Sequence, residues 1–284
     1  MIRFLVGAYV FAIGASIGSF LNVCIGRWPE GLSVVRPRSR CPKCGHQISA
    51  LENVPIFSWL FLRGRCKGCG ERISFQYPAV ELLVGVMWLA AYLAYGPSLT
   101  ALRVAVFATV MTGISITDAK YFLIPDGFTV FGLFWQLGTA LLALYFADGG
   151  PFAQPWAAAI GMCVGAGAIS IVGWLGEVAL KRPAMGFGDV TLMAVVGAAV
   201  GPERALLTIF LASLIAPIVL LLVVYPLSSR VMGTDPGQTE LPLDAAPSWR
   251  RRELPFGVFL APAAIVALLW GDALIGWYIN VSGL

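Results

Sequence analysis

The sequence predicts an all-α polytopic membrane protein of about eight transmembrane helices, with a small zinc-ribbon-like insert between the first and second. Hydrophobic residues make up 58% of the 284 residues, and the mean hydropathy is +0.82. Charged residues make up only 12%, about half the usual share of a soluble domain. Too little polar sequence remains to cover a soluble core, so the membrane class is predicted before any motif is considered.

Eight segments approach the roughly 20 apolar residues that a helix needs to cross a bilayer. They cover about residues 4–24, 77–95, 100–117, 126–147, 156–180, 189–201, 204–226 and 257–281. The sixth is short, and only Gly201, Pro202 and Glu203 separate it from the seventh, so seven spans are the alternative. The first segment lacks a strongly basic start and an A-x-A cleavage site, which predicts a retained span rather than a cleaved signal peptide.

The Lys and Arg residues predict the orientation, because cytoplasmic loops are enriched in them. Nine of the 19 lie in the polar stretch 25–76, and the alternate loops 118–125, 181–188 and 227–256 supply seven more. Both termini are then expected outside and four polar segments in the cytoplasm. Seven spans would place the arginines of the last loop on the wrong side, so the charge distribution favours eight. Three positively charged residues remain outside, namely Arg3, Arg103 and Arg204.

This topology divides the chain into a first transmembrane helix at 1–24, a cytoplasmic cysteine domain at 25–76, and a membrane domain at 77–284. The membrane domain is expected to contain seven helices and a flexible cytoplasmic loop at 227–256, a stretch without a recognisable motif. No basic run with interleaved aromatic residues suggests a nucleic-acid partner. The lipid bilayer is therefore the partner that composition alone predicts.

The cysteine domain contains two C-x2-C pairs separated by 21 residues, a spacing typical of one tetrahedral structural zinc site. Four thiolates leave no open position, so such a zinc would stabilise the insert without taking part in chemistry. Two disulfides are the alternative, which a reducing cytoplasm disfavours. His46, the only histidine, is expected to be exposed and not a ligand, and Cys24 and Cys163 are expected to be buried in spans. The predicted ligands are Cys41, Cys44, Cys66 and Cys69.

Carboxylates in or beside spans are candidate functional groups, because an ionisable side chain is costly there. Asp118 ends the third predicted span and Asp189 begins the sixth, so both are expected at the cytoplasmic face at similar depth. Two carboxylates that share a proton are the reaction centre of an aspartyl protease, since one activates water while the other polarises the scissile carbonyl. Helix caps or ion-pathway residues are the alternative. The remaining carboxylates of this kind are Glu81, Asp126, Glu177 and Asp272.

The residues around the two aspartates support the protease hypothesis. Gly186 and Gly188 precede Asp189 and would let a substrate backbone approach closely. Asp126 fits a helix N-cap or first-turn position and is a candidate supporting residue. A single histidine argues against Ser-His and Cys-His hydrolases, and neither an H-E-x-x-H motif nor a Walker loop is present.

Taken together, these motifs resemble the bacterial type 4 prepilin peptidases, the bifunctional leader peptidase/N-methyltransferases of type IV pilus and type II secretion systems. The similarity covers nearly the whole chain, and six motifs occur in order. They are 18–24 (GSFLNVC) with Arg27-Trp-Pro29, the four-cysteine insert, 76–83 (QYPAVELL), Asp118 with Pro125-Asp126, Gly186-Phe-Gly-Asp189, and 254–259 (LPFGVF).

The resemblance implies that Asp118 and Asp189 are the catalytic pair of a membrane aspartic endopeptidase. Its substrates would be prepilins or pseudopilins, whose short basic leader ends in Gly before a hydrophobic helix, and the cut would fall at the cytoplasmic face of the bacterial inner membrane. The family usually has Lys two residues after the second aspartate, where this chain has Thr191. That departure puts the shell around Asp189 in doubt more than the aspartates themselves.

The resemblance also implies methylation of the new N-terminal amine with S-adenosylmethionine, an activity that maps to the insert and its surroundings. Gly64 and Glu81 are the candidate residues, and a turn glycine and a buried polar anchor are the structural alternatives. Two other functions stay open. One is a GxGD protease with different membrane substrates, and the other is a non-enzymatic zinc-ribbon scaffold.

Overall fold

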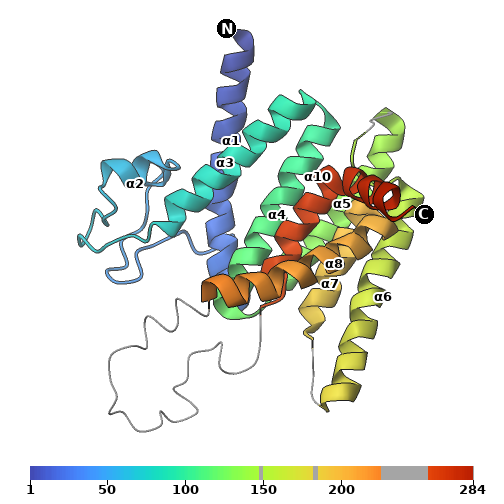
Figure 1. Cartoon of the computed structure of the whole chain (residues 1–284). Coiled ribbons are helices and arrows are strands. Elements are labelled where there is room, and N and C mark those ends of the chain that lie inside the picture. Colours follow the sequence, from blue (N-terminus) through green and yellow to red (C-terminus); the bar gives the residue numbers. More distant parts are fainter. Residues whose placement is uncertain (147–149, 182–184, 225–254, 284) are drawn as a thin grey trace.

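The computed structural model describes residues 1–146, 150–181, 185–224 and 255–283 (Figure 1). Within these residues the chain is helical, with short connecting segments and two isolated β-bridges in the insert. Most of the predicted loop 227–256 lies outside the described residues, as do Arg182, Arg230 and the arginines at 250–252 on which the orientation partly depends. The all-α membrane fold is confirmed by the elements below.

Within the described residues, seven helices are long and apolar enough to cross a membrane. They are α1 (Ile2–Arg27), α3 (Gln76–Tyr95), α4 (Leu99–Tyr121), α5 (Asp126–Phe146), α6 (Pro155–Leu180), α8 (Pro202–Val219) and α10 (Gly257–Ser282). The predicted sixth span is a separate apolar helix, α7 (Phe187–Val200), of 14 residues. Gly201, at φ 84°, ends it immediately before Pro202 begins α8, so the predicted boundary between the two segments is a true helix break.

The core of the molecule surrounds α4, whose apolar residues are the most completely buried. Phe107, Met111 and Ile114 have at most 1% of their surface exposed. They belong to one cluster that also includes residues of α1, α3, α7, α8 and α10. By contrast, Phe134 of α5 and Trp156 of α6 are more than three-quarters exposed. Such outward apolar side chains are expected where lipid, not water, surrounds the helices.

Two helix pairs rely on glycine for close packing, as the small residues of the spans predicted. In α1, a Cβ on Gly18 would lie 2.8 Å from the Cα of Glu81 in α3. In α6 and α7, a Cβ on Gly161 or on Gly197 would collide with the carbonyl oxygen of the other. The second contact fixes the position of α7, the helix that carries Asp189.

The insert between α1 and α3 contains only short helical elements, namely η1 (Trp28–Glu30), η2 (Leu51–Asn53) and α2 (Phe57–Phe61). Figure 1 shows it beside the start of α3, toward the end of the bundle where α4 ends and where α7 and α10 begin. A π-helical turn, η3 (Leu220–Val224), extends α8. The candidate groups in the insert and at the helix ends therefore share one side of the molecule.

The two cysteines of the membrane helices differ in environment. Cys24 is 2% exposed, as expected. The expectation for Cys163 is wrong, because this residue is exposed on α6. An apolar helix in a membrane can bury its residues in lipid as well as in protein, and hydropathy does not separate the two faces.

Replacing Gly197 with Ala should destabilise the protein by about 1–3 kcal/mol, the usual cost of overpacking, because the added methyl group meets the backbone of α6. Thermal unfolding in detergent would measure the loss. Gly167→Ala is the matched control, since a Cβ at this position of α6 meets no atom within 4 Å. Equal melting temperatures for the two variants would contradict the packing described for α6 and α7.

Candidate active site and metal site

The carboxylate of Asp118 lies against the first turn of α10. Asp118 is 5% exposed, and its Oδ2 accepts a hydrogen bond of 3.1 Å from the backbone N–H of Val258. Glycine at position 257 permits this approach, because a Cβ there would lie 2.9 Å from the same oxygen. The first N–H groups of a helix have no intrahelical acceptor and carry partial positive charge, so the start of α10 favours a carboxylate.

Asp189 lies in the first turn of α7, where Gly186 is the N-cap residue. The backbone N–H of Asp189 donates to the Gly186 carbonyl at 3.2 Å, and a Cβ on Gly186 would lie 3.7 Å from Asp189 Oδ2. Asp189 is partly buried. Thr191 donates its hydroxyl to the Gly188 carbonyl at 3.0 Å, so it stabilises its own helix turn and brings no positive charge to Asp189.

Ile124 links the two aspartate segments. It is 6% exposed, and its side chain would lie 2.9 Å from a Cβ on Gly188 and 2.9 Å from a Cβ on Gly257. One buried side chain thus packs against the start of α7 and the start of α10, and both contacts require glycine. Asp118 and Asp189, 71 residues apart in sequence, are close enough to interact electrostatically.

The other carboxylates of the spans lie in different surroundings. Asp126 is the first residue of α5, in the first-turn position that the sequence predicted, and it is exposed. Glu177 is exposed on α6. Asp272 of α10 is exposed and forms an ion pair of 3.5 Å with Arg204 of α8, whose side chain is largely buried. Only Asp118 and Asp189 combine burial with mutual interaction among the aspartates that the structure describes.

The four cysteines of the insert form one cluster. Their sulfur atoms all lie within 4.8 Å of one another, and the Cys41–Cys69 and Cys44–Cys66 sulfur pairs are each 3.9 Å apart. Tetrahedral thiolates at about 2.3 Å from zinc have sulfurs separated by about 3.8 Å. A disulfide would require about 2.05 Å. The geometry therefore suits a four-thiolate metal site and not two disulfides.

The two knuckles repeat the same backbone turn. Gly45 donates its N–H to Cys41 and Gly70 donates to Cys66, with φ of 72° and 73° at the two glycines. The insert forms one isolated bridge beside each turn, between Arg40 and Gln47 and between Arg65 and Arg72. The turn glycines that follow each C-x2-C pair are thus required by a left-handed backbone conformation.

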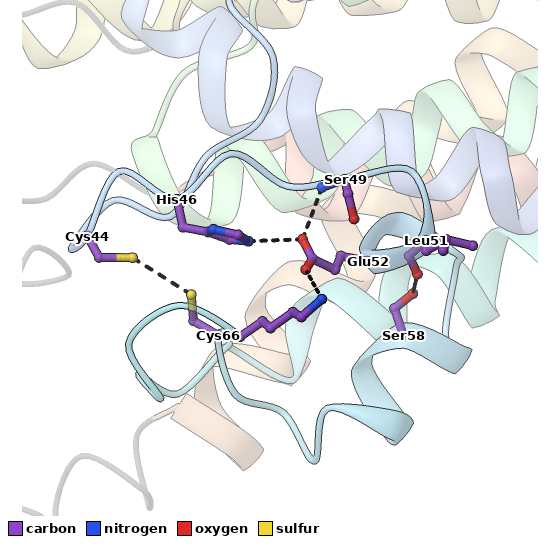
Figure 2. A network of polar contacts seen from close by, with 8 residues as sticks. Cys44, His46, Ser49, Leu51, Glu52, Ser58 and Cys66 are labelled. Carbon is purple, nitrogen blue, oxygen red and sulfur yellow. Dashed lines mark hydrogen bonds and ion pairs between the residues drawn. The ribbon is translucent and has the colours of Figure 1, made fainter.

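Glu52 connects the two knuckles (Figure 2). Its Oε2 accepts the Ser49 N–H at 3.0 Å and lies 3.1 Å from His46 Nε2, while Oε1 lies 3.4 Å from Lys67 Nζ. The Ser49 N–H, followed by His46 and Lys67, lowers the pKa of Glu52 to about 2. His46 is half-buried rather than fully exposed, and its contact with Glu52 agrees with the expectation that it is not a metal ligand.

A cavity of about 430 Å³ separates the insert from α1 and α3. Glu81 lies in its wall, 8% exposed, and its Oε2 accepts the Ile56 N–H at 2.7 Å. Ile56 has φ 65° and ψ −54°, a strained conformation for a β-branched residue. Gly64 does not line the cavity, and its φ is 65°. It packs against the side chain of Trp59, which lines the cavity.

Sequence reasoning missed three residues that the structure places at these sites. Gly257 and Val258 contact Asp118, whereas the sequence indicates only that they begin the last span. Asn22 lines the cavity beside Glu81, whereas the sequence indicates only that it belongs to the first motif. A glycine and a polar residue at the ends of apolar spans were the available signals, but neither indicates a distant partner in sequence.

The comparisons with known proteins agree with this geometry. Residues 12–95 match the Bacterial Peptidase A24 N-terminal domain, and residues 105–221 match the Type IV leader peptidase family. The second match contains both Asp118 and Asp189, whereas α10 lies beyond it. No solved structure matched the chain.

Three of the relatives that carry the name prepilin leader peptidase/N-methyltransferase illustrate the similarity. The protein of Myxococcus xanthus is 36% identical over 86% of this chain and 70% of its own length. The protein of Aeromonas hydrophila is 33% identical over 95% of this chain and 93% of its own length. The protein of Bacillus subtilis is 30% identical over 96% of this chain and 98% of its own length. Similarity at this level extends over the membrane helices, the insert and both aspartates, and the chain belongs to the type IV leader peptidase family.

Proposed function

We propose that this protein is an aspartic endopeptidase that removes the basic leader of prepilins or pseudopilins. The observation that carries the proposal is the convergence of Asp118 and Asp189 beside Ile124, from two helices far apart in sequence. The names of the relatives supply the substrate class. Helix caps alone would give no reason for a buried and a partly buried aspartate to come within electrostatic range of each other at two helix ends.

The proposed chemistry uses the two aspartates as one unit. Like charges at short range do not both ionise, so the pair retains a single proton. The ionised carboxylate removes a proton from water, and the protonated one donates a hydrogen bond to the scissile carbonyl. The Val258 N–H holds Oδ2 of Asp118 and so fixes the orientation of that carboxylate. Gly186 leaves room for the substrate backbone beside Asp189, whereas Ile124 fills the space beside Gly188.

The location of the pair supports cleavage at the membrane surface. Asp118 lies near the end of α4 and Asp189 near the start of α7, on the side of the bundle toward which the insert lies (Figure 1). The density of Lys and Arg in stretch 25–76 supports a cytoplasmic location for that side, in the inner membrane of a bacterium. A prepilin with its hydrophobic helix in the bilayer would present the end of its leader there.

We further propose that the insert binds structural zinc through Cys41, Cys44, Cys66 and Cys69, and that the protein methylates the new N-terminal amine. S-adenosylmethionine supplies the methyl group in this reaction. Glu81 is the stronger of the two candidate residues, since it is buried in a cavity wall. The contact with Trp59 supports a turn role for Gly64, which would act on methylation only through the shape of the cavity.

Two alternative functions predict different outcomes. A GxGD protease with other substrates would leave a prepilin uncut while cleaving other membrane-protein tails. A non-enzymatic scaffold would cut no peptide bond, and loss of its cysteines would disrupt a partner complex. A purified prepilin carrying basic residues before a Gly-Phe junction, tested beside a junction-altered control, separates both alternatives from the proposal.

Replacing either Asp118 or Asp189 with Asn should lower prepilin cleavage by roughly a thousandfold or more, because neither variant can form the proton-sharing pair. Gel or mass analysis of a purified prepilin would measure the rate. Glu177→Gln is the matched control, an exposed carboxylate on α6. A near-normal rate for either aspartate variant would exclude the pair as the reaction centre. Methylation of an already cleaved peptide should persist in both.

Replacing Cys44 and Cys66 with Ser should remove the bound metal, because the remaining two thiolates cannot hold a tetrahedral zinc tightly. Elemental analysis of the purified protein should give about one zinc per chain before and nearly none after the change. Cys163→Ser is the control, a cysteine exposed on α6 outside the cluster. Zinc that stays bound in the double variant would rule out the four-thiolate site.

A further inference from the structure

The cavity between the insert, α1 and α3 has the size of a small-molecule site. Its volume of about 430 Å³ falls within the usual range of ligand pockets. A second cavity of about 400 Å³ shares several lining residues with it, including Ser19 and Arg27, so the two adjoin. The larger one contains buried polar groups at the α1–α3 wall, where a Cβ on Gly18 would lie 2.8 Å from the Cα of Glu81.

Asn22 leaves a buried hydrogen-bond acceptor in this wall. The residue is 6% exposed, and its Nδ2 donates to the backbone carbonyl of Tyr77 at 3.1 Å. That bond fixes the amide, and Oδ1 accepts no hydrogen bond from any residue that the structure describes. A buried acceptor without a donor is costly, so this oxygen calls for a donor from a bound molecule.

Glu81 adds a negative charge beside it. Gly18 allows α1 to approach the Glu81 backbone closely, and the carboxylate receives the N–H of the strained Ile56. No Lys or Arg in the described part of the chain forms an ion pair with Glu81, whereas Lys67, in the same cavity, pairs with Glu52. A buried carboxylate of this kind favours a cation, and together with Asn22 it favours a cationic hydrogen-bond donor.

We propose that this cavity binds S-adenosylmethionine, with the cationic methionine end of the molecule against Glu81 and Asn22. The inference rests on the proposed methylation and gives it a location. On transfer, the substrate amine forms a new N–C bond, the S–C bond breaks with its electron pair left on sulfur, and one proton leaves the nitrogen for water. The product S-adenosylhomocysteine has a neutral sulfur, so it loses part of its attraction to Glu81.

Calorimetric titration of the full-length, zinc-loaded protein in detergent tests this assignment. Glu81→Gln should weaken S-adenosylmethionine binding roughly tenfold and remove the preference over S-adenosylhomocysteine, because the amide keeps an acceptor for Ile56 but no charge. Asn22→Ala should weaken both ligands. Glu30→Gln, an exposed carboxylate near the end of α1, is the matched control.

A purely structural role for Glu81 and Asn22 predicts a lower melting temperature with unchanged ligand preference, and that result would overturn the inference while leaving the proposed function intact. Ultraviolet cross-linking of radiolabelled S-adenosylmethionine to wild-type protein provides a test that needs no variant. The label should map to peptides that contain Trp59 or Tyr77, which line the cavity. A label elsewhere would refute the location. A wild-type protein that neither binds nor uses the donor would remove the methylation proposal as well.

Discussion

The packing of Ile124 between the first turns of α7 and α10 is the contact on which the candidate active site depends. Gly188 and Gly257 each leave the space that a side chain would otherwise fill. Because the start of α10 can approach Ile124 closely, the Val258 N–H reaches Asp118. Because the start of α7 can also approach Ile124 closely, Asp189 comes within electrostatic range of the Asp118 carboxylate. A larger residue at either position would separate the two aspartates without changing their chemistry.

This arrangement also explains why a short helix carries Asp189. With 14 residues, α7 cannot cross the bilayer unaided, and its position depends on close glycine contacts with α6. Contacts between glycine backbones leave little freedom for sliding or rotation, because any shift brings main-chain atoms into collision. The carboxylate in its first turn is therefore positioned by helix packing rather than by a loop, which is the more precise of the two means.

Polar contacts attach the insert to the first turns of α3 and to the residues just before it. Ile56 donates to Glu81 of α3, and Trp59 donates its indole N–H to the carbonyl of Ile73 just before α3. Inside the insert, Glu52 spans the two cysteine knuckles. Ile56 and Trp59 lie between the two knuckles in sequence, so a metal bound by the four cysteines would tie together the two ends of the segment that makes these contacts.

The sequence by itself determined the membrane class, the approximate spans, the cysteine cluster and the two aspartates, since each of these depends on local composition or short spacing. It predicted the α7–α8 break from Gly201 and Pro202 for the same reason. Only the tertiary structure decided that Cys163 is exposed, that Gly257 and Val258 contact Asp118, and that Asn22 and Glu81 share a cavity. These facts depend on which helix faces are in contact, and hydropathy in a membrane protein does not distinguish a face covered by lipid from one covered by another helix.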